Sequence, residues 1–134
     1  MVINYNNVLV STATPKINQN ISAEGTHFIT ITYDIPVVLS NGTITVFQND
    51  GSSSGIIRQI TNGLENGNYV NLVGNTVNVT VISSTFNNPG ATYYVIIGNG
   101  FVMSQLYNEP LLGLNNNVWT FSTSKLFTNF SREK

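Results

Sequence analysis

The chain has 134 residues, of which 41% are hydrophobic and 8% are charged, and its formal net charge is −1. A chain of this length and composition can bury its own core, so we expect one domain that folds alone. The charge balance offers no basic field for nucleic acid or anionic lipid, and the lack of cysteine excludes disulfides and cysteine nucleophiles. No apolar run approaches the roughly 18 residues of a membrane span, so we expect neither nucleic-acid binding nor membrane insertion.

In chain order, the sequence reads as short alternating segments separated by turns rich in Asn, Gly and Pro. The predicted strands cover residues 8–13, 18–24, 27–34, 43–47, 56–60, 69–73, 75–81, 93–97 and 117–123. Residues 101–107 are predicted to be irregular. No segment keeps a helical period of 3.6 residues, so we expect almost no helix.

The clearest pattern is a hairpin in which apolar residues recur at every second position on both sides of a Pro89-Gly90 turn. Such strands bury one face, and a hairpin alone is not stable in water, so a second layer must cover it. The prediction is therefore an all-β antiparallel sandwich of about seven strands. The expected inner faces are Ile29, Ile31, Tyr33, Ile44, Val46, Val77, Val79, Val81, Phe86, Tyr93, Val95, Ile97, Trp119 and Phe121.

Several segments resemble the bacterial Ig-like domain family of surface-layer proteins and adhesins. The segments are ITITYDIPV, GTITV, NTVNVTV, STFNNPGATYYV, NEPLLG and NVWTFST, and they span residues 29–123 in the order that the family shows. The family's opening turn usually contains a Gly, which the segment Thr14 to Asn18 lacks, and the loop 62–75 is longer than expected. The resemblance implies an Ig-like sandwich over residues 1–123, followed by a tail or linker at 124–134.

The resemblance also implies a function. It suggests a non-enzymatic module of a cell-surface or secreted protein that acts as a structural spacer or as an adhesion or protein-interaction domain. The alternative is a carbohydrate-binding domain, because Asn amides and exposed aromatic rings suit sugars. The expected partners are a protein or a neighbouring repeat domain, a second copy in a weak homodimer, or a glycan. The expected location is extracellular or on the cell surface. No signal peptide is visible, which we interpret as excision from a longer protein.

Strand parity yields one candidate interaction patch. If alternate residues of three strands face the core, then Phe47, Tyr94, Ile96 and Val118 face outward. The Ig-like order makes these strands neighbours, so the four side chains are expected to form a contiguous apolar surface. Leu126, Phe127 and Phe130 of the tail are an alternative cover for that surface.

The remaining candidates are weaker. Four sequons for N-glycosylation occur at Asn20, Asn41, Asn78 and Asn129. His27 is the single histidine and lacks an orienting acid close in sequence, so we expect it to be solvated rather than catalytic. Tyr93 is expected to form a structural corner. No catalytic, metal or cofactor site is expected, although loop acids leave a calcium site as a minor alternative.

Overall fold

A computed structural model describes residues 9–23, 27–64 and 69–124. These residues form 11 strands and no helix, so the all-β class expected from the sequence is confirmed. The strands are β1 (Val10–Thr14), β2 (Asn20–Ile21), β3 (Phe28–Tyr33), β4 (Val37–Leu39), β5 (Thr43–Gln48), β6 (Ile56–Asn62), β7 (Val70–Val73), β8 (Thr76–Thr80), β9 (Thr92–Ile97), β10 (Val102–Ser104) and β11 (Leu114–Thr123). In this part of the chain no helix could cross a membrane.

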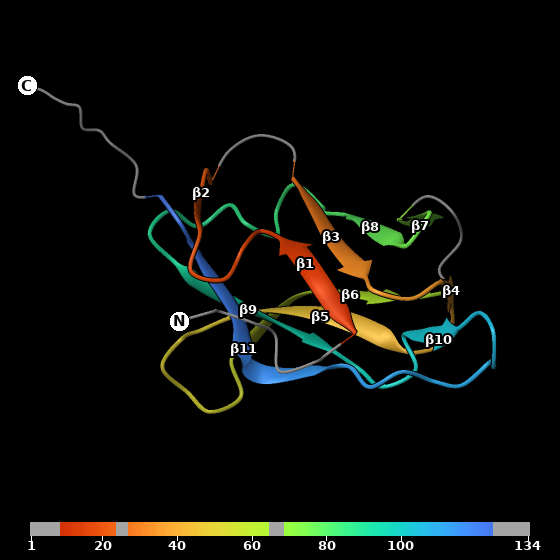
Figure 1. Ribbon diagram of the computed structural model, residues 1–134. Helices are drawn as coiled ribbons and strands as arrows, with labels where there is room; N and C mark the ends of the chain where they lie inside the picture. Colours follow the sequence, from red (N-terminus) through yellow and green to blue (C-terminus); the bar gives the residue numbers. More distant parts are fainter. Residues whose placement is uncertain (1–8, 24–26, 65–68, 125–134) are drawn as a thin grey trace, which may run out of the picture.

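Two sheets form the layers of the sandwich (Figure 1). The four-stranded sheet has the order β1-β3-β8-β7, and the five-stranded sheet has the order β2-β11-β9-β5-β6. Neighbours are antiparallel except β2, which pairs in parallel with β11. A small sheet of β10 and β4 lies at one end. The expectation that the strands now labelled β5, β9 and β11 share a sheet is therefore confirmed.

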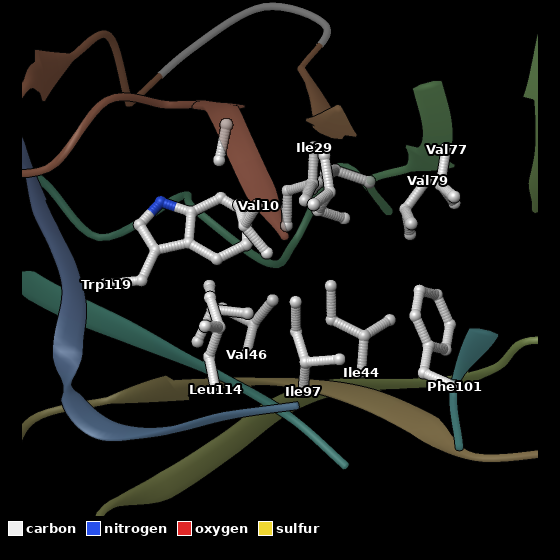
Figure 2. Packing of buried hydrophobic residues seen from close by; sticks show 14 of the residues in the cluster. Val10, Ile29, Ile44, Val46, Val77, Val79, Ile97, Phe101, Leu114 and Trp119 are labelled. Atoms are coloured by element: carbon white, nitrogen blue, oxygen red, sulfur yellow. The ribbon is translucent and has the colours of Figure 1, made fainter. Parts of the chain in front are cut away.

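The core lies between the two sheets (Figure 2). Val10, Ile29, Val77 and Val79 face it from one layer, and Ile44, Val46 and Ile97 face it from the other. Every residue that parity predicted for the inner faces is buried, with exposed fractions of 8% or less. Trp119 is fully buried, and its indole Nε1 donates a hydrogen bond of 2.7 Å to the carbonyl of Pro15. This bond anchors β11 to the segment after β1.

Sequence reasoning missed part of the fold. Residues 102–104 were expected to be irregular, but they pair as β10 with β4, which was not predicted either. The closing strand β11 begins at Leu114, three residues before the expected start at residue 117, and its register with β9 shifts between Leu114 and Trp119. The proposed tail residue Ser124 continues the pairing, since its N–H donates to the carbonyl of Ile21 at 2.7 Å. The rest of the tail, 125–134, lies outside the described residues.

Candidate functional site

The outward surface of the five-stranded sheet carries a row of apolar side chains. Register places Phe47 opposite Tyr94 on one side and Ile57 on the other. One step along the strands, Thr45 lies opposite Ile96 and Ile60. We call these six residues, which share the surface of three adjacent strands, the apolar face: Thr45, Phe47, Ile57, Ile60, Tyr94 and Ile96.

An aromatic stack forms the middle of the apolar face. The rings of Phe47 and Tyr94 lie 5.0 Å apart and are almost parallel, with 5° between their planes. Both residues are half-buried, whereas Ile57 and Ile60 on the edge strand are 54% and 56% exposed. The face therefore combines a fixed aromatic centre with exposed aliphatic side chains.

The loop between β5 and β6 borders this stack. Its backbone reaches the ring of Tyr94, whose hydroxyl donates to the carbonyl of Ser54 at 3.5 Å. Gly55 has a φ of +66° and lies so close to the Tyr94 hydroxyl that a Cβ atom would not fit. Within the loop, hydrogen bonds from the hydroxyl and the backbone N–H of Ser52 lower the pKa of Asp50. The loop is thus folded on itself beside the apolar face.

The centre of the other outer surface has the opposite character, although Phe28 and Val73, which are 52% and 65% exposed, lie at the ends of its strands. On β3 and β8, the residues between the buried Ile and Val positions are hydroxyl or amide side chains, and we call them the polar face: Thr30, Thr32, Thr76, Asn78 and Thr80. Thr32 and Thr76 are joined by a hydrogen bond of 2.9 Å between their hydroxyls. Polar outer surfaces are the norm for antiparallel sheets that face water. The apolar face departs from this norm within the same molecule.

The interaction patch that strand parity predicted agrees only in part with the apolar face. The structure brings Phe47, Tyr94 and Ile96 together, but Val118 packs partly against the core and lies at the margin. Sequence reasoning missed Ile57 and Ile60. Ile57 breaks the simple parity of β6 because the register shifts between Val46 and Phe47, so that Arg58 is the extra residue.

Two of the sequons lie on open surface. Asn20 on β2 and Asn41 in the turn before β5 are exposed. Asn78 lies in the middle of the polar face, where its amide donates to Asn71 at 3.4 Å. Asn129 lies outside the described residues. Glycosylation of these sites stays a prediction.

His27 lines a groove of about 480 Å³ between β2 and the start of β3. The other lining groups are mostly neutral, with Thr14, Asn20, Ser22 and Thr30 among them. Nε2 of His27 lies 2.7 Å from the carbonyl oxygen of Ser22. Because a carbonyl oxygen only accepts, Nε2 of His27 is the donor in this hydrogen bond.

Tyr93, expected as a structural corner, is buried in the core. Its ring packs edge to face on Phe86, with ring centroids 5.0 Å apart. Burial raises the pKa of the hydroxyl, which the backbone of Asn88 partly opposes. The hydroxyl has no hydrogen bond of standard geometry within the described residues, although it lies near the backbone of Asn88 in the loop before β9, so the corner role stays a prediction.

No family model and no curated protein matches this sequence. Among solved structures, the chain is similar to CopC from Methylosinus trichosporium OB3b, with a TM-score of 0.56 and 8% sequence identity. The likeness covers 87% of this chain and 93% of CopC. At this identity the comparison shows the fold alone, and the resemblance to bacterial Ig-like domains stays a prediction.

The neighbour corrects the function expected from the sequence. CopC is a copper-binding periplasmic protein, which contradicts the expected spacer or adhesion module and its carbohydrate-binding alternative, but at 8% identity the match assigns no function to this chain. The residues of this chain do not fit a copper centre either. Copper sites use imidazole, thiolate and thioether ligands. The described residues contain no group of three or more His, Cys, Asp or Glu side chains that could hold a metal ion.

Proposed function

We propose that the protein is a non-catalytic domain that forms a homodimer through the apolar face. The observation that carries the proposal is the contrast between the two outer surfaces of one sandwich. Both sheets bury their inner residues equally well, so folding alone does not require Phe47, Ile57 or Ile96 on an outer surface. Monomers rarely expose contiguous apolar patches without using them.

The charge of the apolar face favours a second copy of the chain as its binding partner. In a two-fold dimer the same surface meets itself, so an excess of one sign of charge on that surface repels its copy. All six side chains of the apolar face are uncharged, and the whole chain has a net charge of −1. Arg58, on the edge strand, directs its guanidinium to Ser84 and Asn87 of its own chain at 2.6 and 3.0 Å. Two copies therefore meet here without electrostatic repulsion.

Shape also favours a second copy. The outer surface of a sheet is broad and gently twisted, and two such surfaces pack face to face about 10 Å apart. The aromatic stack of Phe47 and Tyr94 lies beside the aliphatic Ile57 and Ile60 on the adjacent edge strand. A two-fold axis near Thr45 places the aromatic centre of one copy over the aliphatic edge of the other.

Sedimentation velocity over a wide range of protein concentration tests the proposal. We expect the wild type to dimerise and a double variant with Phe47→Ser and Tyr94→Ser to stay monomeric with its fold retained. The matched control is a double variant with Leu106→Ser and Leu112→Ser, which removes side chains that are 76% and 74% exposed elsewhere. The control should dimerise like the wild type, and high salt should not weaken the dimer, because no ion pair holds it.

Two results would overturn the proposal. The first is a wild type that sediments as a monomer at every concentration. The second is a double variant of Phe47 and Tyr94 that still dimerises. If the wild type is monomeric and the double variant also melts early, the apolar face is covered within the chain, and deletion of residues 125–134 should then destabilise the domain to a similar degree.

A further inference from the structure

The sandwich resembles that of a copper-binding protein, which raises the question of what its one imidazole does. The sequence offers one His, two Met and no Cys as nitrogen or sulfur ligands for copper. Of the two methionines, the described one is Met103, which is half-buried in β10 and pairs with Val38 of β4. His27 lies elsewhere, at the start of β3. The described donors, His27 and Met103, are therefore not gathered at one place.

The imidazole of His27 makes two contacts within the fold. Its Nε2 donates a hydrogen bond to the carbonyl of Ser22, just after β2, at 2.7 Å. Its ring packs edge to face against Phe86, with ring centroids 5.6 Å apart and 79° between the planes. Phe86 is 1% exposed and packs in turn against Tyr93 and Phe121 of the five-stranded sheet. The ring thus connects the end of β2 with the aromatic part of the core.

We infer that His27 is a structural latch between β2, β3 and Phe86, and that this chain uses a CopC-like sandwich without a copper centre. A hydrogen bond from one ring nitrogen to a carbonyl is also what orients a metal-binding histidine. However, the side chains that line the groove beside His27 supply neutral hydroxyls and amides, from Thr14, Gln19, Asn20, Ser22 and Thr30. Such oxygen donors are poor ligands for copper, and one imidazole cannot make a tight site alone.

The test combines copper titration with thermal unfolding of the wild type and variants at His27. We expect neither Cu(II), followed by electron paramagnetic resonance, nor Cu(I), followed by competition with a chelator, to bind the wild type stoichiometrically. We expect His27→Ala to lower the melting temperature by about 3–6 °C, because both the hydrogen bond and the ring contact are lost. His27→Phe, which keeps a ring beside Phe86, and His27→Gln, which keeps a donor for Ser22, should each lose less.

The matched control is Tyr107→Ala, which removes a ring that is 71% exposed, and it should melt like the wild type. Stoichiometric copper binding by the wild type would overturn the absence of a copper centre, and its loss in both His27→Phe and His27→Gln would assign that centre to His27. A His27→Ala variant that melts like the wild type would overturn the latch. If His27→Ala does not fold, the ranking of the Phe and Gln variants below the wild type still tests it. None of these outcomes depends on dimer formation.

Discussion

Among the residues that the structure describes, Gln59 is the one buried side-chain amide, and it joins the two sheets at the β6 edge. Its side chain is 6% exposed. The Oε1 atom accepts from the backbone N–H of Ile82 at 3.0 Å and from the hydroxyl of Thr85 at 2.8 Å. The Nε2 atom donates to the carbonyl of Thr80 and to the hydroxyl of Thr61, both at 3.0 Å. All four hydrogen-bonding positions of the amide are filled.

We predict that Gln59→Ala destabilises the domain by about 2–4 kcal/mol. The substitution leaves several buried groups unpaired, each at a cost of about 1–3 kcal/mol, and it also leaves a small cavity. Urea unfolding followed by tryptophan fluorescence measures the effect. Gln105→Ala, at an exposed position, is the control and should change stability little. Equal midpoints for the two variants would show that this amide network contributes nothing to stability.

The buried phenol of Tyr33 makes the stability of the folded state depend on pH in the alkaline range. The residue is 3% exposed, and burial raises the pKa of its phenol well above the ordinary value of 10.0. The unfolded state loses this proton near pH 10 while the folded state keeps it. The contribution of Tyr33 is therefore fully present below pH 10 and is lost as pH rises above it.

We accordingly predict that the melting temperature falls above about pH 10 and that Tyr33→Phe reduces this fall, because Phe has no proton to lose. Melting curves across the alkaline range measure the difference. Tyr107→Phe changes a phenol that is 71% exposed, so it should leave the alkaline fall unchanged. The idea fails if Tyr33→Phe and the wild type lose stability in parallel.

The buried residues could be predicted from sequence, but the polar partners could not. Alternation alone identified Val77, Val79, Val95 and Ile97 as core residues, because burial on one face of a strand imposes period 2. Gln59 follows the same alternation, but only three-dimensional neighbours reveal that its amide is fully paired. The same holds for His27, whose contacts lie on Ser22 and Phe86 and not on an acid.

Among the strands, the length of each strand decided whether it could be predicted from the sequence. Strands of five or six residues, such as β3, β5 and β9, carry enough alternation to be recognised. The three-residue strands β4 and β10 do not, and only their mutual pairing defines them. The pairing of β2 with β11 joins segments about a hundred residues apart, and a two-residue strand leaves no pattern for it.

Register irregularities explain why the candidate site was only partly foreseen. A shift between Val46 and Phe47 of β5, opposite β6, brings Ile57 beside Phe47. Strict alternation from the buried Gln59 and Thr61 would place Ile57 on the inner surface. Bulges of this kind redirect side chains without any signal in hydrophobic periodicity. The edge strand β6 therefore adds the most exposed part of the apolar face, although the sequence predicted a strand only over residues 56–60 and placed none of its residues in the patch.

At the scale of the molecule, one outer surface has a centre of hydroxyls and amides with Phe28 and Val73 exposed at its ends, and the other carries the contiguous apolar face. The polar face suits water, and the apolar face suits a second copy of the same surface. The fold neighbour does not decide this use, because sites differ between proteins that share a fold. The proposal of a homodimer therefore rests on the surface of this chain and not on its fold neighbour.

A concentration series of two-dimensional amide NMR spectra tests the homodimer most directly. As protein concentration rises, we expect progressive shifts or broadening for residues 45, 47, 57, 60, 94 and 96, which form the apolar face. The amides of residues 30, 32, 76, 78 and 80, on the polar face of the same molecule, should stay unchanged. Spectra that do not depend on concentration, or changes confined to the polar face, would contradict the account.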